Sequence, residues 1–312
     1  MDAERRTYHH GSLTVQRRLG VEGEAAHIGR SIGGGIRPVA AAFLELQPHL
    51  VLAAADAEGR MWASLLTGRP GFARATGPHS VSVRGGPPAG DPLAGALATG
   101  PVPAAALALD PRTRRRMRMG GSVRPSARGL LLETERVFSN CPKYIQQRLP
   151  LPAAPGAGDA APAVPLHRTG EELDGDQSAF LRAADTFFIA TGTSDGVDVS
   201  HRGGNPGFLR VASPTGLSWP DYPGNAMFLT LGNLERDPRA GILALDWSTG
   251  ATLQLTGTAR TAYAPGGART VHFTVERTVH TEAASPVRWT APRYSPANPA
   301  LPQDAPPGPG AG

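Results

Sequence analysis

The chain consists of two related halves. At a constant offset of 136 residues, the distance from Ser64 to Ser200, about 60 positions align with few gaps. The identities cluster, and they include residue types that rarely coincide by chance in a chain rich in Ala, Gly and Pro. The pairs place Ser64, Gly68, Pro70, Gly71, Phe72 and Arg74 on Ser200, Gly204, Pro206, Gly207, Phe208 and Arg210, and Leu107, Gly121 and Arg124 on Leu243, Gly257 and Arg260. We therefore expect two copies of one fold.

Each copy has the pattern of a β-rich unit. Short apolar runs such as 51–55, 105–109, 187–190 and 242–245 are bounded by Gly, Pro, Asp or Ser, as strands of a sandwich or barrel are. The 39 Gly and 31 Pro also favour many turns over long helices. The expected fold class is mainly β with flanking helices (α+β), and the expected helices cover residues 15–33, 133–148 and 177–184.

Composition shifts divide the chain into five segments. The stretch 149–166 is Pro, Ala and Gly with few charged or large side chains, which predicts a linker. The stretch 295–312 has a similar composition and no apolar periodicity, which predicts a disordered tail. The remaining segments are an N-terminal helical segment (1–40), the first copy with a closing helix (41–148) and the second copy (167–294).

The net charge of +5 comes from arginine, because Lys143 is the only lysine. The run 112–119 resembles a nucleic-acid patch, but Met117 and Met119 alternate in it with Arg116 and Arg118. Such alternation predicts an amphipathic strand with a solvated, arginine-rich outer face, and we expect no nucleic-acid partner.

The sequence predicts neither a signal peptide nor a membrane-spanning segment. A single cysteine, Cys141, excludes an intrachain disulfide and fits a reducing compartment. The first ten residues are polar, and no segment has 18 consecutive apolar residues. These features predict a soluble cytoplasmic protein without a membrane partner.

The two copies differ most in polar residues. The segment Ser200-His201-Arg202-Gly203-Gly204 in the second copy faces Ser64-Leu65-Leu66-Thr67-Gly68 in the first. A guanidinium group matches phosphate oxygens, and Asn225, Thr230 and Asn233 can add side-chain hydrogen bonds to the same anion. A Gly-rich turn followed by a helix with polar caps explains the same residues without a ligand, so both interpretations stay open.

Other site chemistries lack their motifs. The sequence contains no G-x-x-x-x-G-K-[ST] loop, no H-E-x-x-H pair and no G-x-S-x-G elbow. We therefore expect no metal site. Cys141 is followed by proline and has no neighbouring histidine to activate it, so we expect a buried, unreactive side chain.

Several motifs together resemble the pyridoxamine 5'-phosphate oxidase-like FMN-binding split-barrel flavoproteins, in their bacterial tandem-barrel branch. The second half supplies DVSHRGGNPGFLR (198–210), PDYPGN (220–225), LGNL (231–234), DPRAG (237–241) and LQLTG (253–257). The first half supplies DAEGRMW (56–62), SLLTG (64–68) and NCPKYI (140–145). The resemblance covers most of residues 8–299.

The resemblance implies two tandem split β-barrels, with FMN in the groove between them. It places the phosphate or the polar edge of the flavin near Ser200, His201, Arg202 and Arg210. The turn and helix that hold the phosphate would carry Asn225, Thr230 and Asn233, and Gln254 would point toward the ring system. Trp219, Tyr222 and Trp289 are candidates for the walls around the ring. Ala226 and Thr230 depart from the family pattern, which has basic residues there.

The resemblance also implies an FMN-dependent oxidoreductase that binds its FMN mainly through the second copy. Electrons would pass from a reduced nicotinamide or a separate reductase to a small-molecule substrate, an electron acceptor or oxygen, and no catalytic side chain is predicted. The alternative is a non-catalytic flavin- or haem-binding module. Three questions stay open at this point: whether the cofactor is FMN rather than FAD or a deazaflavin, what the physiological substrate is, and whether the chain forms a homodimer.

Overall fold

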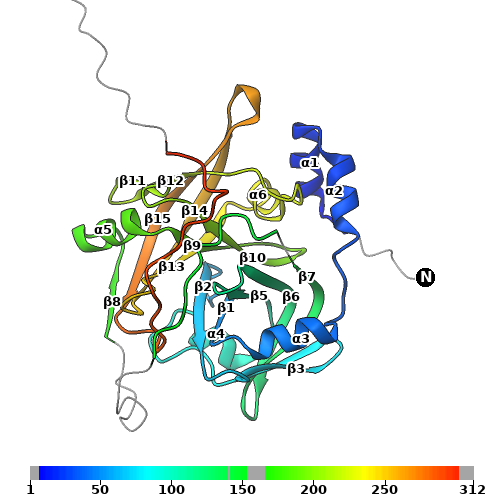
Figure 1. Cartoon of the computed structure of the whole chain (residues 1–312), viewed down its shortest axis with the longest axis vertical. Coiled ribbons are helices and arrows are strands. Elements are labelled where there is room, and N and C mark those ends of the chain that lie inside the picture. The colour runs from blue at the N-terminus through cyan, green and yellow to red at the C-terminus, as the bar shows by residue number, and fades with distance from the viewer. Residues whose placement is uncertain (1–6, 140, 153–165, 302–312) are drawn as a thin grey trace, which may run out of the picture.

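Two antiparallel sheets with the same strand order make up the protein. The computed structural model describes residues 7–139, 141–152 and 166–301. The first sheet has the order β2-β1-β5-β6-β7-β4-β3 and the second has β10-β9-β13-β14-β15-β12-β11, with β8 paired to β15 (Figure 1). This arrangement confirms the predicted fold class of two tandem split β-barrels with flanking helices.

The strands of the first sheet are β1 (His49–Ala55), β2 (Met61–Thr67), β3 (Ala73–Gly77), β4 (Ser80–Arg84), β5 (Val102–Asp110), β6 (Arg115–Ser126) and β7 (Gly129–Ser139). Those of the second are β8 (His167–Gly170), β9 (Thr186–Thr193), β10 (Gly196–Gly203), β11 (Arg210–Ser213), β12 (Gly216–Pro220), β13 (Arg239–Leu245), β14 (Thr252–Tyr263) and β15 (Arg269–Thr281). The helices are α1 (His10–Leu19), α2 (Glu22–Gly29), α3 (Pro38–Glu45), α4 (Ala94–Thr99), α5 (Gly175–Ala183) and α6 (Leu229–Leu234), with a 3₁₀ turn at Pro265–Gly267.

The longest hairpins of the two sheets carry the same irregularity at matching positions. The β6–β7 ladder shifts register between Gly120 and Gly121, and the β14–β15 ladder shifts between Thr256 and Gly257. A Cβ atom on Gly121 would lie 1.9 Å from the Glu133 carbonyl oxygen, and one on Gly257 would lie 1.9 Å from that of Thr274. Only glycine fits this approach, so the duplication preserved the bulge together with its residue.

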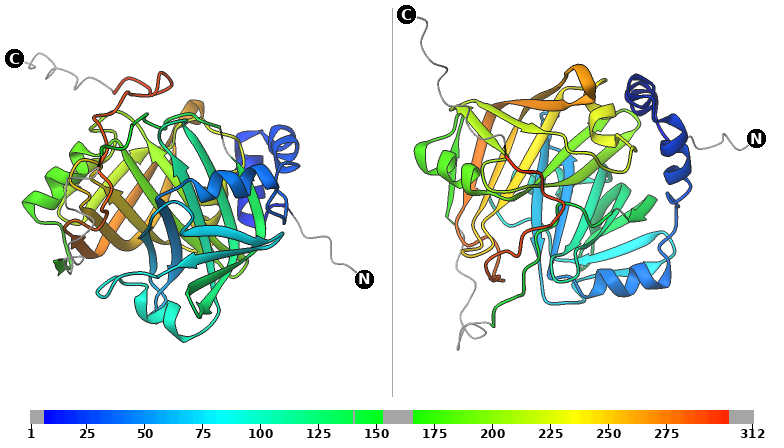
Figure 2. Two further views of the ribbon diagram at one scale, coloured as in Figure 1. Left: turned by 60° about the horizontal axis from the view of Figure 1, so that its bottom comes forward. Right: turned by 45° about the horizontal axis from the view of Figure 1, so that its top comes forward.

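The barrels pack against each other through strands that are buried on both faces. Along β1, Leu50 and Leu52 belong to the core of the first barrel, whereas Val51 belongs to a separate apolar cluster between the barrels. Along β9, Ile189 packs inside the second barrel and Phe188 packs in the same interface cluster. This double burial explains why these strands are continuous apolar runs rather than alternating ones. In Figure 2 the central strands of the two sheets lie side by side.

The helices partly follow the sequence prediction. The predicted helix 15–33 is two helices, because Gly20 adopts a left-handed conformation (φ 65°) that ends α1. The predicted helix 177–184 is α5, which begins with a capping box between Asp174 and Gln177.

The predicted closing helix 133–148 is wrong. Residues up to Ser139 continue β7 in register with β6, and the chain then runs without regular structure across the second barrel. The alternating buried residues Leu130, Leu132 and Thr134 pair with a long neighbouring strand. This pairing outweighs the helix propensity of the charged residues among them.

Parts of the predicted linker and of the predicted tail contact the rest of the chain. The Leu151 amide donates to the Arg288 carbonyl at 2.8 Å, so the start of the predicted linker lies against the second barrel. Residues 153–165 lie outside the described residues. In the predicted tail, Ser295 is buried, and its amide donates to the side chain of Gln146 at 2.8 Å. Residues 295–301 are therefore ordered by hydrogen bonds to the rest of the chain, and residues 302–312 lie outside the described part.

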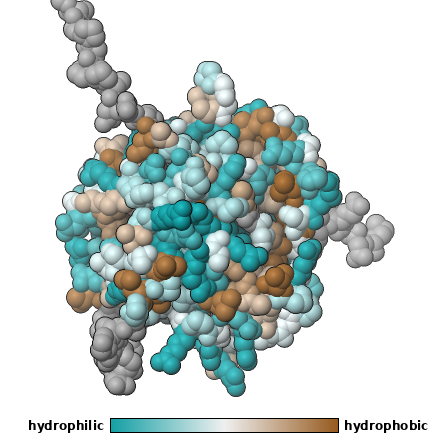
Figure 3. Space-filling view, in the orientation of Figure 1, coloured by the Kyte–Doolittle hydropathy of each residue, from teal (hydrophilic) through white to brown (hydrophobic). Residues whose placement is uncertain are grey.

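The surface is mixed in polarity. Figure 3 shows hydrophilic side chains gathered near the centre of one face, with apolar side chains in separate patches around them. Within residues 7–139, 141–152 and 166–301, no helix has the length and apolar character needed to cross a bilayer.

A buried histidine makes the barrel interface sensitive to acid. His49 Nε2 lies 2.7 Å from the Ser285 hydroxyl, and its ring packs against Trp247 and Trp289. Burial lowers the pKa of His49 to about 4. In the unfolded chain His49 binds a proton near pH 6.5, whereas in the folded chain it stays neutral at that pH. The free energy of unfolding therefore falls as the pH drops below about 6.5.

We predict that His49 accounts for about 2 kcal/mol of stability lost between pH 7 and pH 5. Denaturant unfolding of His49→Gln at both pH values should show a loss smaller by that amount than in the wild type. His10→Gln, which changes an exposed histidine, is the control and should keep the wild-type pH dependence. An unchanged pH dependence in His49→Gln would contradict the assignment.

Candidate functional site

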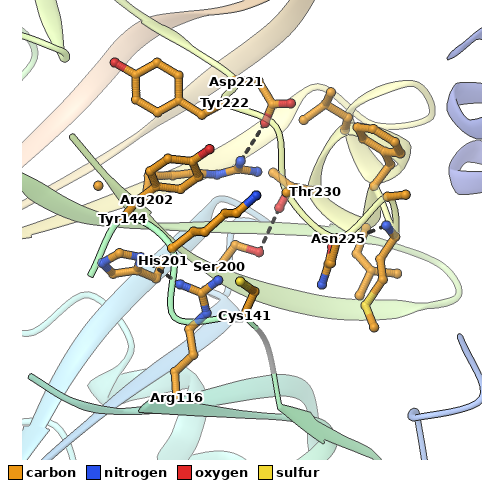
Figure 4. A pocket seen from close by; sticks show the side chains of 18 of the residues that line it. Arg116, Cys141, Tyr144, Ser200, His201, Arg202, Asp221, Tyr222, Asn225 and Thr230 are labelled. Carbon is orange, nitrogen blue, oxygen red and sulfur yellow. Dashed lines mark hydrogen bonds and ion pairs between the residues drawn. The ribbon is translucent and has the colours of Figure 1, made fainter. Parts of the chain in front are cut away.

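A cleft lies between the two barrels. Strand β10 of the second barrel and β6 of the first form its walls, and the segments 141–145 and 220–228 border its mouth (Figure 4). It encloses about 860 Å³, counting the part open to solvent. Its polar lining residues are Arg116, Arg118, Cys141, Lys143, Tyr144, Ser200, His201, Arg202, Asp221, Tyr222, Asn225 and Thr230. We call it the inter-barrel cleft.

Two arginines of the first copy enter this cleft from β6. In the β5–β6 ladder Arg116 faces Leu109 and Arg118 faces Leu107, and both leucines belong to the interface cluster between the barrels. The two arginines therefore extend the interface face of the sheet rather than a solvated face. The predicted solvated outer face of this strand is wrong, because the second barrel covers it.

A buried chain of hydrogen bonds connects β6 of the first barrel to β10 and α6 of the second barrel. Arg118 donates to Asp198 and forms a salt bridge with it. The hydroxyl of Ser200 donates to the other oxygen of Asp198 at 3.2 Å, and the hydroxyl of Thr230 donates to Ser200 at 3.0 Å. All four side chains are buried, so the network fixes the floor of the cleft.

Arg116 has no acidic partner among the described residues. Its Nη1 lies 3.1 Å from His201 Nδ1, and since a guanidinium can only donate, Nδ1 accepts and the proton of His201 sits on Nε2. Burial, Arg118 and Arg202 lower the pKa of Arg116. An arginine stays protonated in proteins. The lowered pKa therefore indicates that the positive charge of Arg116, buried beside two other arginines, is unfavourable without an anion.

His201 is neutral in this environment. Burial, followed by Arg116 and Arg202, lowers its pKa well below the usual value. Its Nε2 is buried and finds no hydrogen-bond partner in the described part of the chain. The imidazole therefore offers a neutral N–H donor rather than a positive charge.

The third arginine of the cleft is paired. Arg202 Nη1 donates to Asp221 at 2.6 Å, and Arg269 Nε donates to the second oxygen of the same carboxylate at 2.8 Å. Asp221 thus joins β10 to the segment that borders the mouth of the cleft.

The segment that follows β7 crosses β10 at very short range. A Cβ atom on Gly203 would lie 2.0 Å from the Tyr144 carbonyl oxygen, so glycine is required there. Gln146 Nε2 donates to the carbonyl oxygens of Tyr144 and Gly204, both at 3.1 Å, and Arg148 forms a buried salt bridge with Asp185. These contacts hold Cys141, Lys143 and Tyr144 at the mouth of the cleft.

Two tyrosines lie together at this mouth. The rings of Tyr144 and Tyr222 are 5.2 Å apart, and the Tyr144 hydroxyl donates to the Pro223 carbonyl at 2.8 Å. Cys141 is exposed at the mouth, so the predicted buried position is wrong. Lys143, also exposed, adds a further cation.

The N-terminal helices support the opposite lip. Ala226 and Phe228 have left-handed backbone conformations (φ 55° and 50°), which are strained for residues with a Cβ atom. The Gln16 side chain of α1 donates to the Met227 carbonyl at 3.1 Å. Helices α1 and α6 also contact each other closely at two glycines, since a Cβ atom on Gly11 would lie 2.0 Å from the Gly232 carbonyl oxygen. Packing of α1 thus maintains the strained lip.

The structure brings together five of the eight predicted site residues. Ser200, His201, Arg202, Asn225 and Thr230 all line the inter-barrel cleft. Asn225 accepts a hydrogen bond from the Met227 amide at 3.3 Å, which shapes the lip.

The other three predicted site residues lie elsewhere. Arg210 lines a separate cavity on the outside of the second barrel. Asn233 is buried, and its side chain donates to the Thr191 hydroxyl at 3.0 Å. Gln254 of β14 is buried against the first barrel, where its Nε2 donates to the Ala63 carbonyl at 3.0 Å. Of the predicted aromatic walls, Tyr222 lines the cleft, whereas Trp219 packs in the second barrel and Trp289 in the interface.

The position of Gln254 shows why the cleft occurs once. At the offset of 136 residues Gln254 corresponds to Arg118 and Ser64 corresponds to Ser200, so the pair marks the equivalent groove on the other side of the interface. There Gln254 Nε2 donates to Ser64 Oγ and to Asp91 Oδ2, both at 3.1 Å. Burial raises the pKa of Asp91. Side chains of the protein itself therefore fill this groove.

Sequence reasoning missed the contribution of the first copy. Arg116 and Arg118 were expected on a solvated strand face and Cys141 was expected to be buried, whereas Lys143 and Tyr144 were expected in a closing helix, yet all five line the cleft. Two signals for them were present: the NCPKYI motif, and arginines spaced two apart on a strand that follows an interface strand. In the described part of the chain, no group of three or more His, Cys, Asp or Glu side chains could hold a metal ion.

Comparison with known proteins gives matches among solved structures only. No family model and no curated protein matches the sequence. A candidate pyridoxamine 5'-phosphate oxidase from Lactobacillus delbrueckii is 16% identical, with 35% of this chain and 94% of that chain covered and a TM-score of 0.30. A FAD-binding protein from Mesorhizobium loti is 12% identical, with 37% and 98% covered and a TM-score of 0.27.

A third solved structure is a Clostridium acetobutylicum protein of the pyridoxinephosphate oxidase family, related to a general stress protein of Bacillus subtilis. It is 10% identical, with 37% of this chain and 91% of that chain covered and a TM-score of 0.27.

We predict that Gly203→Ala destabilises the protein by about 3 kcal/mol, because the new methyl group would overlap the Tyr144 carbonyl. Chemical denaturation measures the loss, and hydrogen exchange of residues 144–148 should rise in the same variant. Gly95→Ala, where no atom lies within 4 Å of the new methyl group, is the control and should keep the wild-type stability or exceed it slightly. A stability of Gly203→Ala equal to that of the wild type would refute the close crossing.

Proposed function

We propose that the chain binds FMN in the inter-barrel cleft, with the phosphate at Arg116, and acts as a flavin-dependent oxidoreductase. The observation that carries this proposal is the guanidinium of Arg116, which is crowded by Arg118 and Arg202 and has no acidic partner in the described residues. A phosphate monoester carries nearly two negative charges at pH 7 and offers three acceptor oxygens, which suits such a donor.

The remaining lining residues fit the other parts of FMN. Tyr144 and Tyr222 offer aromatic surface for a planar ring, and Lys143 adds a cation near the entrance. The buried Nε2–H of His201 and the Nε–H of Arg202 are donors for which the described residues offer no acceptor.

The chemistry would come from the cofactor, because bound FMN supplies one- and two-electron transfer. The side chains of the cleft then bind and orient it. The chain Thr230–Ser200–Asp198–Arg118 fixes the floor, so Arg116 and His201 keep their positions before a ligand arrives. His201, held neutral, donates a hydrogen bond without adding a charge.

The filled second groove supports one flavin per chain. A bound phosphate there would have to displace the buried hydrogen bonds among Gln254, Ser64 and Asp91, and the carboxylate of Asp91 would oppose a second anion. One cofactor for two barrels follows from this difference.

We predict that Arg116→Gln weakens FMN binding at least about tenfold, since it removes a charge-assisted contact to the phosphate. Riboflavin, which lacks the phosphate, should bind the wild type and the variant equally. Fluorescence quenching of each flavin gives both dissociation constants. Arg115→Gln, which changes the neighbouring exposed arginine of β6, is the control and should bind FMN as the wild type does.

The result that would refute the placement of the phosphate is equal FMN affinity in Arg116→Gln and Arg115→Gln. A wild type that binds neither FMN nor riboflavin would refute the proposed cofactor altogether.

The oxidoreductase activity has a separate test. We predict that the FMN-loaded protein loses its flavin absorbance near 450 nm, a property of flavins in general, when a reduced nicotinamide is added without oxygen. Readmitted oxygen should restore the band. Retention of the band with both NADH and NADPH, and with a reduced protein donor such as a ferredoxin, would support the non-catalytic binding module instead.

A further inference from the structure

A second cavity lies on the outer face of the second barrel. Cross-strand register places Arg210 of β11 opposite Ser218 of β12, and Pro220 of β12 opposite Thr270 of β15. Because side chains alternate along a strand, these four residues share one face of the sheet. All four line a cavity of about 670 Å³, counting its open mouth.

The C-terminal segment forms the roof of this cavity. Ala300 and Leu301 line it, and Leu301 packs against the edge of the second-barrel core. Two asparagines hold the segment in place, since Asn298 Nδ2 donates to Asn205 Oδ1 at 3.0 Å and Asn205 Nδ2 donates to the Pro299 carbonyl at 3.3 Å. The roof is therefore fixed to the barrel by specific contacts, although composition alone predicted disorder there.

The walls of the cavity are aromatic. Phe208 and Tyr222 line it, and their rings are stacked with their centroids 6.5 Å apart. Trp219 also borders it, although its side chain is buried in the core of the second barrel. Together with Leu301 they give an apolar slot that suits a flat ring.

A single cation stands beside this apolar slot. Arg210 is exposed, and no salt bridge or hydrogen bond joins it to an acidic group among the described residues. It lies close enough to Tyr222 to influence that hydroxyl electrostatically. A guanidinium next to aromatic walls recognises a carboxylate attached to a ring.

The first copy provides a natural comparison. Arg74 faces Ser82 across β3 and β4, as Arg210 faces Ser218 across β11 and β12, and both pairs are related by the offset of 136 residues. The C-terminal residues Ala300 and Leu301 lie on the second copy. The arginine is thus common to both copies, whereas the roof is an addition to one of them.

We propose that this cavity binds a small planar aromatic carboxylate, with its ring between Leu301 and the aromatic walls and its carboxylate on Arg210. The site goes beyond the proposed function, because its binding does not require FMN. It shares Phe208, Pro220 and Tyr222 with the lining of the inter-barrel cleft, so a ligand there lies next to the cleft without occupying it.

Calorimetric titration of the full chain with 2-naphthoate and with its uncharged analogue 2-naphthamide tests the site. We expect naphthoate to bind at least about tenfold more tightly than naphthamide. Arg210→Gln should remove that difference by weakening naphthoate alone. Arg74→Gln, the equivalent arginine of the first copy, should leave both affinities unchanged. Leu301→Ala should weaken both ligands, because it removes the roof over the ring.

Competition with FMN locates the ligand independently. We expect saturating FMN to leave one naphthoate bound per chain. If the chain proves not to bind FMN, the Arg210, Arg74 and Leu301 variants still test the site. Displacement of naphthoate by FMN would place it in the inter-barrel cleft and overturn the proposal. Equal affinity for naphthoate and naphthamide, equal effects of Arg210→Gln and Arg74→Gln, or no binding of naphthoate at millimolar concentration would also overturn it.

Discussion

The structure depends on the apolar interface between the two barrels. Strands β1 and β9 bury both of their faces, one in their own barrel and the other against the neighbouring barrel. Close backbone packing reinforces this contact, since a Cβ atom on Gly241 of β13 would lie 2.5 Å from the Met61 carbonyl oxygen of β2. The inter-barrel cleft is made of residues from both copies, so the interface that stabilises the fold also creates the site.

Divergence after the duplication explains why the two equivalent grooves differ. Two related barrels packed face to face produce two equivalent grooves, and the residues at corresponding positions have diverged. Arg118 pairs with Asp198 on the floor of an open cleft, whereas Gln254 fills the other groove with Ser64 and Asp91. A similar difference separates Arg210 from Arg74, because Ala300 and Leu301 of the described C-terminal segment line the cavity at Arg210. The asymmetry therefore lies in side chains and in one added segment, while the strand order stays the same.

The sequence predicted the duplication and the β-rich class, because these depend on patterns within each copy. Five of the eight residues that it predicted for a site line the inter-barrel cleft. It could not predict contacts between copies. Arg116 and Arg118 had the alternation of an exposed strand face, and only the position of the second barrel makes that face an interface. Gln254 was expected at the ligand because its strand was known but its groove was not. Residues 133–139 carried helix-forming side chains, yet pairing with β6 made them a strand.

The central claim is that the cleft floored by Arg116 and Arg118 is the flavin site of the chain. Crystals of the protein grown with FMN test it most directly, through the position of the phosphorus atom in the electron density. The account predicts one FMN per chain, with phosphate oxygens within hydrogen-bond distance of the Arg116 guanidinium. A phosphate beside Gln254, or a flavin bound outside the inter-barrel cleft, would contradict it.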